Sequence, residues 1–388
     1  MSAPVSAPVS TPVSAPRVLL VMPLGELLGG GEMMFRQLLQ HGRDGRVEWI
    51  VVFTRGGAMV DEAKALGYET HLLPVGRLRQ LGRRWSVIRS IARLARERKV
   101  SMVFGWMVAS QTMAGPAAWL AGVPAAWYQV GLAGPDWLDR LATLCPACGI
   151  LVLSRDCAAA QARVWPHRPQ RLVYPGASLE RFDAARSESP AEARAALGLP
   201  PTGTLIGIVG RLQRWKGMHV LIDALPAVRA RHPEAHVVIV GGAHEPEPDY
   251  PAALRAQVRH LRLDDAVTFA GYQADVPRWM QAMDIIVHAS DREPFGIVVI
   301  EAMALGKPVV AGAAGGPAEV ITPGVDGLLA PFGDAPALTD ALLRYLDDPA
   351  LAARCAQGAA LRARDFSASR YADAVTGAIL DLLDDGAR

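Results

Sequence analysis

Two glutamates in the C-terminal half have the type and spacing that recognition of hydroxyl groups requires. Seven residues separate Glu293 from Glu301, and they begin Pro-Phe-Gly before an apolar run from Ile297 to Ile300. Proline and glycine mark the start of this stretch, and Gly-Lys-Pro marks its end. The pattern predicts a helix over about 296–305, preceded by a tight loop.

The predicted helix start and the two carboxylates suit different parts of one ligand. The first amides of a helix lack intrahelical partners and carry partial positive charge, which suits a phosphate group. Glu301 lies further along the helix, where its carboxylate is better placed to accept hydrogen bonds from hydroxyls such as a ribose diol. Glu293, just before the turn, could contact a second set of hydroxyls. The alternative is a solvated helix that carries two surface acids.

A basic loop earlier in the chain could supply the cations that such an anionic ligand needs. Residues 210–217, Gly-Arg-Leu-Gln-Arg-Trp-Lys-Gly, follow an apolar strand pattern and precede a helical one. Open α/β sheets bind ligands at the carboxyl ends of their strands, where this loop would lie. Arg211 and Lys216 could hold a diphosphate there from two sides, with Arg214 as a third contact or a solvated charge. Holding a diphosphate matters if it is a leaving group, because negative charge then develops on it in the transition state.

The sequence gives little support for a metal or a cofactor. The residues above include no pair of acids suited to bridging magnesium, so we expect no essential metal and no cofactor. Cys145 and Cys148 have the spacing of a redox or zinc pair, with Cys157 and His167 beyond them, but no second pair follows. A buried structural pair is therefore the favoured interpretation. Four cysteines in 388 residues are too few for a disulfide framework, which favours a cytosolic protein.

Strand and helix patterns alternate along most of the chain, and these elements must position the side chains above. Such alternation predicts an α/β fold with parallel sheets and right-handed crossovers. A length of 388 residues and a hydrophobic content of 51% suit two globular domains and exclude wholesale disorder. The polar, proline-rich stretch over 183–203 marks the boundary. We expect a disordered tail at 1–16, an N-terminal domain at 17–187, a C-terminal domain at 188–365 and a final helical segment at 366–388.

The N-terminal domain begins with a strand, a glycine loop and a helix. An apolar run from Arg17 to Met22 precedes Gly29, Gly30 and Gly31, and a helical pattern follows. This order brings backbone close to a ligand at a helix N-terminus. The spacing matches neither GxGxxG nor a Walker motif. The loop is therefore either a contact for a phosphate or sugar or a plain flexible turn.

Charge is spread unevenly between the two halves. Residues 1–187 hold 22 Lys or Arg against 13 Asp or Glu, a balance of +9, whereas the rest holds 18 against 25, a balance of −7. A basic half suggests an anionic partner such as a membrane surface or an acidic acceptor. We expect no nucleic-acid partner.

Residues 76–99 concentrate this charge, with nine basic residues and one acidic residue. Apolar side chains recur through the stretch at helical spacing: Leu81, Trp85, Ile88, Ile91 and Ala95. Such a helix can lie on an anionic membrane. It can equally pack its apolar stripe on the sheet and present its arginines to water. No apolar run reaches the ~18 residues that a membrane-spanning helix needs, so any membrane contact would be peripheral.

Three motifs in the C-terminal half resemble those of the retaining glycosyltransferases of family 4. They are G-R-L-x-x-x-K-G at 210–217, E-P-F-G-I-V-V-I-E-A-M-A-x-G-x-P-V-V-A at 293–311 and G-G-P-A-E-V at 315–320. The resemblance covers nearly everything from Arg17 to the C-terminus. It implies the GT-B fold, in which two Rossmann-like domains face each other across a cleft. It also implies that the last helix, after about Phe366, crosses back to the N-terminal domain.

The resemblance further implies roles for individual residues. Those implied in catalysis are Arg211, Lys216 and Glu293. Those implied in donor binding are Gly30, Gly31, Gln129, Arg211, Lys216, Tyr272, Glu293, Phe295, Gly296, Ile297, Val298 and Glu301. The two cations and the amides at the helix start would hold the donor diphosphate, Glu301 would bind the ribose, and Glu293 would face the donor sugar. Tyr272 would lie beside the base.

The implied activity is transfer of a hexosyl group from a UDP- or GDP-sugar to a glycan or lipid-linked acceptor, in the building of a cell-surface glycan. The anomeric configuration would be retained, because the acceptor hydroxyl attacks from the face of the leaving group. The departing phosphate oxygen takes the proton, so no dedicated carboxylate base is required. The alternatives are a nucleotide-sugar epimerase or phosphorylase on the same fold and a non-catalytic protein that binds a nucleotide sugar.

The N-terminal half departs from the family pattern. Where related sequences often end two strands with histidine, this chain has Trp106 and Gln129. Gln129 can still donate or accept hydrogen bonds near the sugar, but it cannot change its charge as histidine does. Pro175 to Ser178 likewise replaces an Asn-Gly-Val-Asp pattern. These departures leave donor binding untouched and leave the acceptor and the identity of the sugar open.

Overall fold

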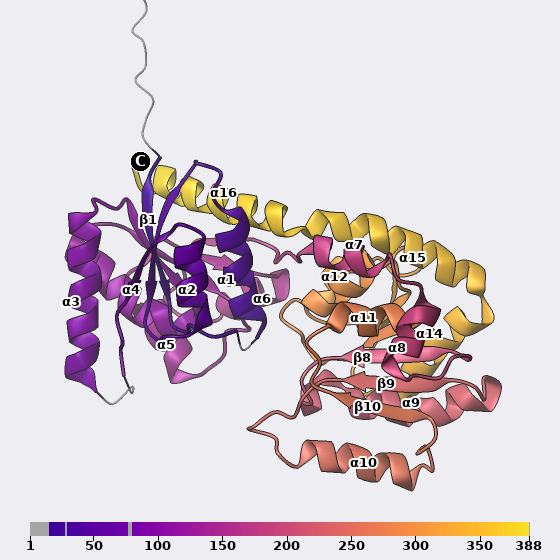
Figure 1. Ribbon diagram of the computed structural model, residues 1–388. Coiled ribbons are helices and arrows are strands. Elements are labelled where there is room, and N and C mark those ends of the chain that lie inside the picture. Colours follow the sequence, from indigo (N-terminus) through magenta and orange to yellow (C-terminus); the bar gives the residue numbers. More distant parts are fainter. Residues whose placement is uncertain (1–14, 28, 77–79, 388) are drawn as a thin grey trace, which may run out of the picture. The chain divides into compact units, whose positions relative to one another are not determined.

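The computed structural model of the chain describes residues 15–27, 29–76 and 80–387. Within these residues it has an α/β architecture built on two parallel sheets, which confirms the predicted fold class (Figure 1). The expected tail at 1–16 lies almost wholly outside the described residues, and so do positions 77–79 of the basic stretch.

The N-terminal sheet has seven strands in the order β3-β2-β1-β4-β5-β6-β7. The strands are β1 (Arg17–Met22), β2 (Glu48–Phe53), β3 (Glu69–Leu72), β4 (Met102–Trp106), β5 (Ala125–Gln129), β6 (Gly149–Val152) and β7 (Gln170–Leu172). β1 pairs in parallel with both β2 and β4, so the chain order reverses there. Ligands bind open α/β sheets at the carboxyl ends of the strands beside such a reversal.

Helices lie between these strands: α1 (Gly30–His41), α2 (Ala58–Ala65), α3 (Leu81–Glu97), α4 (Met107–Ala121), α5 (Trp137–Leu144) and α6 (Arg155–Gln161). α3 packs against α4, and α4 packs against α5. The predicted apolar stripe of α3 is divided. Ile88, Ile91 and Ala95 are buried in the core, whereas Leu81 and Trp85 are 75% and 44% exposed. Among the described residues, no helix combines the length and apolar character that crossing a bilayer demands.

The C-terminal sheet has six strands in the order β10-β9-β8-β11-β12-β13. The strands are β8 (Leu205–Val209), β9 (His236–Val240), β10 (Val267–Gly271), β11 (Ile285–His288), β12 (Val309–Gly312) and β13 (Leu328–Ala330). β8 pairs in parallel with β9 on one side and with β11 on the other, so the chain order reverses between β8 and β11. The N-terminal sheet has the same reversal of strand order.

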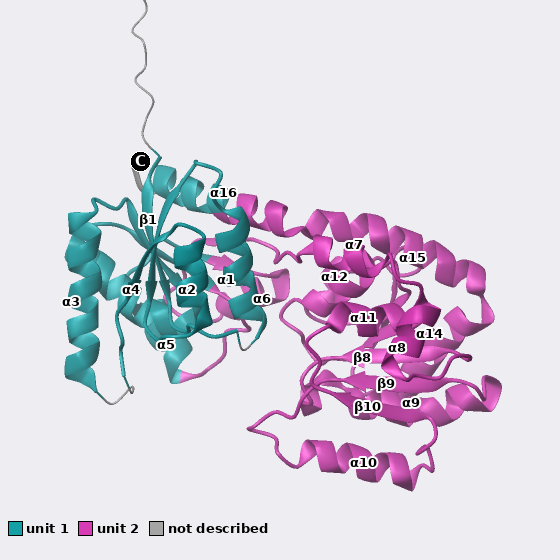
Figure 2. Cartoon of the chain, in the orientation of Figure 1, with its two compact units in different colours: residues 1–128, 137–150, 376–388 teal, residues 129–136, 151–375 magenta. Residues whose placement is uncertain are grey.

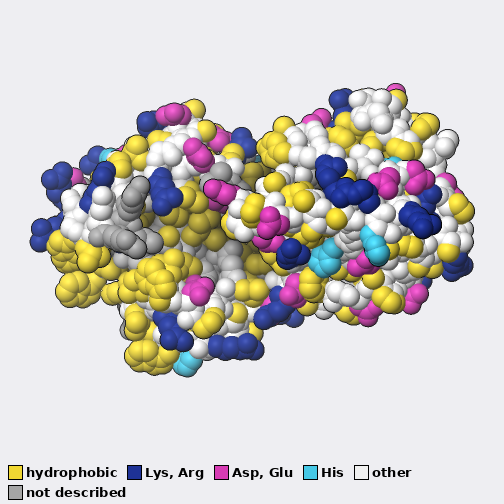
Figure 3. Space-filling view, turned by 90° about the horizontal axis from the view of Figure 1, so that it is seen from below, with side chains coloured by type: hydrophobic (Ala, Val, Ile, Leu, Met, Phe, Trp, Pro, Cys, Tyr) yellow, Lys and Arg dark blue, Asp and Glu magenta, His cyan; other side chains and the backbone are white. Residues whose placement is uncertain are grey.

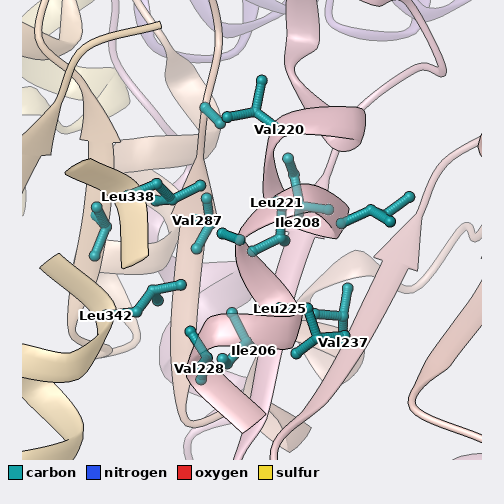
Figure 4. Close-up of a cluster of buried hydrophobic side chains, with 14 of the residues drawn as sticks. Ile206, Ile208, Val220, Leu221, Leu225, Val228, Val237, Val287, Leu338 and Leu342 are labelled. Carbon is teal, nitrogen blue, oxygen red and sulfur yellow. The ribbon is translucent and has the colours of Figure 1, made fainter. Parts of the chain in front are cut away.

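The remaining helices are α7 (Leu179–Ala185), α8 (Pro190–Leu197), α9 (Met218–Arg231), α10 (Tyr250–His260), α11 (Val276–Ala282), α12 (Ile297–Ala304), α13 (Pro317–Val320), α14 (Ala335–Asp347), α15 (Pro349–Ala363) and α16 (Ala368–Ala387). Two short 3-10 turns are η1 (Arg214–Lys216) and η2 (Arg364–Phe366). α9 and α14 cover one face of the C-terminal sheet. There Leu221 and Leu225 of α9 and Leu338 of α14 meet Ile208 and Val287 of the strands (Figure 4). These apolar contacts pack α9 and α14 against the sheet whose strand ends carry the candidate site.

The chain divides by its contacts into two units (Figure 2). One contains Met1–Tyr128, Trp137–Ile150 and Thr376–Arg388, and the other contains Gln129–Asp136 and Leu151–Val375. The end of α16 thus groups with the first unit, where Leu382 packs on the backbone of Gly149. The second unit includes α6 and α7 because both pack on C-terminal motifs. The domain boundary near 187 stays a prediction.

Candidate functional site

Two loops meet at the carboxyl edge of the C-terminal sheet, one following β8 and the other following β11. Gly217, in the first loop, has φ +75°, and a Cβ there would lie 2.0 Å from the carbonyl oxygen of Ala289. The Asp291 amide in the second loop donates a hydrogen bond to the Trp215 carbonyl at 2.8 Å. Because only glycine permits so close an approach, the basic loop lies directly against the acidic one.

Lys216 and Glu293 form an ion pair where the loops meet, with side chains 16% and 12% exposed. The Lys216 ammonium also lies 4.0 Å from the centre of the Trp215 ring. Burial by itself would raise the pKa of Glu293, but His288 and Lys216 outweigh burial and lower that pKa to about 2. Glu293 is therefore a carboxylate at neutral pH and can only accept hydrogen bonds. Two of the predicted catalytic residues are in direct contact.

A histidine absent from the sequence-based predictions completes this group. His288 ends β11, is 3% exposed, and places Nε2 3.4 Å from Glu293 Oε2 and 3.3 Å from Ser290 Oγ. Lys216 and His288 therefore contact the same carboxylate oxygen. A polar residue at the carboxyl end of an apolar strand was the available signal, because ligands bind at that edge.

The other cations of the basic loop are exposed or packed elsewhere. Arg211 lies two residues after Val209, the last residue of β8, and its side chain is exposed to solvent. Arg214 lies over the ring of Tyr250, 5.2 Å from its centre, and its amide donates to Glu247 at 2.9 Å. Arg214 therefore packs on the protein surface, whereas Arg211 is accessible to an anion. The role predicted for Arg211 in diphosphate binding stays a prediction.

Helix α12 begins beside the ion pair, and among the described residues no side chain caps its N-terminus. Gly296 occupies the N-cap position with φ +89°, a conformation that favours glycine. The first turn contains no acidic residue to neutralise the partial positive charge of the helix end. The amides of Ile297 and Val298 therefore face no competing anion of the helix itself. The observed helix also agrees with the span predicted from the sequence.

The ring of Phe295 packs against two other aromatic rings next to the start of α12. Its ring is 3% exposed and lies 5.8 Å from the ring of Tyr174 and 5.7 Å from the ring of Phe366, measured between centres. Aromatic contacts at these distances stabilise the fold beyond the area that they bury. The ring of Phe295 is therefore structural, and only its backbone amide is left for the predicted contact with a donor.

Glu301 lies one turn further along α12 and has a different environment from Glu293. Burial raises its pKa to about 7, and the positive charge of Arg181 opposes that rise. Arg181 belongs to α7, which packs against α12. Glu301 is therefore only partly ionised at neutral pH, and Arg181, which was not among the predicted residues, favours the ionised form.

Tyr272 follows the last residue of β10 and is 80% exposed. Its Cβ lies close to Gly242, at which an added Cβ would approach it to 3.3 Å. The side chain is thus available at the same edge of the sheet as Glu293. Its predicted place beside a nucleotide base stays a prediction.

The predicted glycine loop lies at the carboxyl end of β1 in the N-terminal sheet. Gly30 and Gly31 open helix α1, and the Gly31 carbonyl accepts a hydrogen bond from Trp106 Nε1 at 2.9 Å. Trp106 is fully buried, with edge-on ring contacts to Phe35 at 5.2 Å and to Tyr128 at 5.1 Å. The residue that stands in place of a family histidine is therefore a structural support of the glycine loop.

Gln129 ends β5 and is 2% exposed. It has hydrogen-bonding or electrostatic partners in the folded chain. An amide side chain buried at a strand end is suited to orienting its neighbours, as buried polar groups are normally hydrogen-bonded. Its predicted proximity to the donor sugar stays a prediction.

Glu319, in the third motif, joins α6 to the C-terminal motifs. Its carboxylate accepts hydrogen bonds from the amides of Arg155 at 2.9 Å and Asp156 at 3.1 Å and from the Tyr174 hydroxyl at 2.9 Å. Arg292 adds two bonds to the Asp156 carboxylate, at 2.8 and 3.0 Å. No local pattern pairs these segments, which are more than 100 residues apart.

Within the described residues, no disulfide joins the four cysteines Cys145, Cys148, Cys157 and Cys355. Cys145 is buried and Cys148 is half-buried, and burial raises the pKa of Cys157 to about 11, so that thiol is unreactive. Over 15–27, 29–76 and 80–387, no group of three or more His, Cys, Asp or Glu side chains is arranged to hold a metal ion. The expectation of a metal-independent reaction stays a prediction.

Comparison with known proteins places these features in context. Residues 190–362 match the family model described as Glycosyl transferases group 1. The lipopolysaccharide core biosynthesis mannosyltransferase LpsB of Rhizobium meliloti (strain 1021) is 31% identical over 218 residues, or 55% of this chain and 62% of that protein. The D-inositol 3-phosphate glycosyltransferase of Salinispora arenicola (strain CNS-205) is 39% identical over 208 residues, or 51% of this chain and 46% of that protein. The chain thus spans less than two thirds of the length of these relatives.

The fold extends beyond the matched sequence. The HepE protein of Anabaena, solved in complex with UDP, superposes with a TM-score of 0.82 at 24% identity and covers 94% of this chain and 100% of its own. The same protein has been solved with UDP-glucose, with a TM-score of 0.79. The two parallel sheets described above are therefore the Rossmann-like domains of a GT-B fold.

Proposed function

We propose that this chain, in which residues 190–362 form a glycosyltransferase group 1 domain, moves a hexosyl group from a nucleotide-diphosphate sugar to a glycan or lipid-linked acceptor. The observation that carries the proposal is the buried Lys216–Glu293 pair beside the uncapped start of α12. The pair keeps the Glu293 carboxylate ionised although that side chain is only 12% exposed. Burying a charge costs desolvation free energy, which a purely structural contact does not require. That arrangement suits a site made for a polar ligand.

Different residues of the site suit different parts of the donor. The amides at the start of α12, the exposed Arg211 and the Lys216 ammonium supply positive charge for a diphosphate. Glu293, ionised and able only to accept, suits hydroxyls of the donor sugar. Glu301, further along the helix, suits the ribose hydroxyls.

The reaction we propose is that of the retaining enzymes of family 4. The acceptor hydroxyl attacks the anomeric carbon from the face that the diphosphate leaves, and its proton passes to the departing phosphate oxygen. Arg211 and Lys216 stabilise the charge that develops on the diphosphate as the bond to the sugar breaks. No carboxylate is needed as a base, which agrees with the engagement of Glu293 by Lys216 and His288.

The relatives support a hexosyl donor without fixing its base. The names of two of them specify transfer of mannose and transfer to D-inositol 3-phosphate, and HepE was solved with UDP and UDP-glucose. A UDP-sugar is therefore the first donor to test, and a GDP-sugar the second.

The decisive experiment combines binding and product analysis. The thermal unfolding midpoint should rise with UDP or GDP but not with the free base, because a ligand that binds only the native state stabilises it. Incubation with the α-linked donor that binds should then give an α-linked product by NMR. If neither nucleotide diphosphate shifts the midpoint, the proposal fails. A β-linked product would still show a transferase but would exclude retention of the anomeric configuration.

A second candidate is a non-catalytic protein that binds a nucleotide sugar. The observation that favours it is the fully buried Trp106 at a strand end where the family often has histidine. Such a protein would respond to UDP in the unfolding assay and yet show no transfer and no hydrolysis of the donor over a panel of acceptors. Wild-type turnover that disappears in Lys216→Ala would exclude this candidate.

We also propose that the outer face of α3 meets an anionic membrane surface. Arg89 and Arg93 are exposed beside Leu81 and Trp85, and the Arg89 guanidinium lies 5.3 Å from the centre of the Trp85 ring. Hydrophobic and basic side chains lie next to one another at the left of the view in Figure 3. Basic residues near an anionic surface contribute about 1 kcal/mol each, and exposed aromatic rings suit the interface.

Vesicle sedimentation tests this surface. The chain should bind vesicles that contain anionic phospholipid, should release them at high salt, and should ignore neutral vesicles. The variant Arg89→Gln/Arg93→Gln should bind less, while Arg231→Gln, an exposed arginine on α9, should bind as the wild type does. Equal binding by all three proteins would refute a role for α3.

A further inference from the structure

His288 has an unusual set of surroundings for a histidine at the end of a buried strand. Its Nε2 lies 3.4 Å from Glu293 Oε2 and 3.3 Å from Ser290 Oγ, while Nδ1 is buried and has no hydrogen-bond partner among the described residues. The flanking strand residues are apolar: Val287 precedes it, and Ala311 of β12 is its partner in the sheet. The imidazole therefore has one polar side, and that side faces Glu293.

The unpartnered Nδ1 decides where the ring proton lies. A proton on Nδ1 would be a buried donor without an acceptor, which is costly, whereas a bare Nδ1 lone pair leaves no donor unpaired. A proton on Nε2 faces an ionised carboxylate and a hydroxyl. The neutral tautomer consistent with these contacts is the one protonated on Nε2.

The two oxygens of Glu293 differ as a result. Oε2 is contacted by both Lys216 and His288. Within the part of the chain that the structure describes, the hydrogen bonds and ion pairs of this carboxylate all fall on Oε2. Oε1 is therefore the oxygen left for a ligand.

We propose that His288 is a positioning residue that holds Glu293 when Lys216 turns to the donor diphosphate. Lys216 has two competing anions, because the proposed function requires its ammonium to bind the diphosphate while the resting structure pairs it with Glu293. His288 keeps Oε2 engaged during that exchange, so the carboxylate stays ionised, does not rotate, and presents Oε1 to the sugar. This inference rests on the proposed function for the identity of the ligand.

Three substitutions separate the donated hydrogen bond from the space that the ring fills. In His288→Gln the side-chain amide can place an N–H near the position of Nε2, whereas His288→Asn is too short and His288→Leu fills the volume without a donor. We expect Gln to retain kcat within about threefold, and Asn and Leu to lose about tenfold or more in kcat with a smaller change in donor KM. UDP, which lacks the sugar, should bind all three folded variants about as well as the wild type.

A matched control addresses stability. His236 is a histidine on β9 whose Nε2 contacts Thr268 Oγ1 at 2.8 Å and which has no contact with Glu293. His236→Leu should lower the unfolding midpoint and leave kcat unchanged at temperatures where the protein is folded. Wild-type kcat in His288→Leu would overturn the proposal, as would an equal loss in His288→Gln and His288→Leu.

A measurement independent of turnover keeps this inference distinct from the proposed function. In the full chain labelled with 15N-histidine, the His288 ring should show the Nε2-protonated pattern, and Glu293→Gln should move its Nε2 resonance more than any other histidine signal. An Nδ1-protonated ring, or a resonance indifferent to Glu293→Gln, would refute the positioning role even in an active transferase. Absence of any response to UDP or GDP would remove the proposed function, while the NMR result would still decide whether His288 holds Glu293.

Discussion

The carboxyl edges of the two sheets have opposite chemistry, although both sheets are open, parallel and reversed in strand order. At the C-terminal edge, between β8 and β11, Lys216, Glu293 and His288 form a charged group that burial alone disfavours. At the N-terminal edge, Trp106 and Tyr128 are packed ring against ring. The charged edge makes sense with a ligand, whereas the aromatic edge is stabilised by its own packing. The same topology thus supports one site built for binding polar groups and one built for rigidity.

The largest effect is expected from Lys216→Ala. Removing the ammonium takes away diphosphate charge stabilisation and leaves Glu293 with His288 alone, so turnover should fall by about 100- to 1,000-fold. The unfolding midpoint should also fall, because a buried carboxylate loses its cation. Steady-state transfer assays and thermal unfolding measure the two effects. Lys64→Ala, at an exposed lysine that pairs with Asp61, should change neither turnover nor the unfolding midpoint. If the two variants behaved alike, Lys216 would have no part in the reaction.

Glu293→Gln tests the sugar side of the same edge. The amide keeps the shape but replaces an acceptor-only oxygen with a donor, so turnover should fall by about 100-fold while UDP still raises the unfolding midpoint. Calorimetric titration with UDP and with the intact donor would show the loss only for the donor. Glu247→Gln, which alters the acceptor of the Arg214 amide, is the control. Loss of UDP binding in Glu293→Gln would contradict the assignment of Glu293 to the sugar.

Trp106→Phe tests whether the aromatic edge is structural. The variant loses the hydrogen bond to the Gly31 carbonyl, which should lower the unfolding free energy by about 1–2 kcal/mol. Urea unfolding measures this change, and the midpoint shift caused by UDP should match that of the wild type. Trp119→Phe, at a tryptophan 70% exposed on α4, should cost little. If Trp106→Phe kept normal stability but bound UDP more weakly, the N-terminal edge would be a binding site and not only a structural one.

The smallest effect concerns the pH dependence of nucleotide binding through Glu301. Its pKa in the folded protein is about 7, above the ordinary value of 4.5, so the carboxylate that would accept ribose hydroxyls becomes fully ionised only above neutral pH. UDP affinity should therefore rise a few-fold between about pH 6 and pH 8. Glu301→Gln should abolish that rise. Arg181→Gln should move its midpoint to higher pH, because Arg181 lowers this pKa; a midpoint that moved lower would contradict the pairing.

Glu301 and Glu293 also have opposite consequences for stability. Glu293 has a folded-state pKa of about 2 against 4.5, so the stability it contributes is present above about pH 4.5 and is lost as the pH falls towards 2. Glu301 has a raised pKa, so it favours the folded state at acid pH and weakens that preference as the pH rises from 4.5 through 7. Helix α12 and the loop before it thus contain two acids whose pKa values are shifted in opposite directions.

Sequence patterns predicted the local elements around the candidate site well. The helix around 296–305 and the strand before the basic loop are where the apolar runs and the Gly and Pro signals predict them. These signals are local, and their physical causes are local. The sequence also indicated that Lys216 and Glu293 lie at one edge, because both follow strands of the same parallel sheet.

The contacts that were missed depend on tertiary packing. His288 was not among the predicted site residues, since its neighbours in the strand are apolar and no local rule assigns a partner to a buried imidazole. Helical spacing placed five apolar residues of α3 in one stripe, yet only its later part reaches the core, and Leu81 and Trp85 at the start of the helix are exposed. Arg181 and Glu319 act across long stretches of chain, for which one sequence offers no signal.

The Glu319 carboxylate has a practical consequence for recombining the halves of this fold. A recombinant C-terminal half that starts at 188 would lack the Arg155 and Asp156 amides and the Tyr174 hydroxyl that this carboxylate binds. It would also uncover the Phe295 ring, which Tyr174 covers. A joint placed before Gly149, ahead of β6, keeps all of these contacts within one piece and leaves that strand uncut. Chimeras that recombine the two halves should therefore take β6, α6 and β7 together with the C-terminal half.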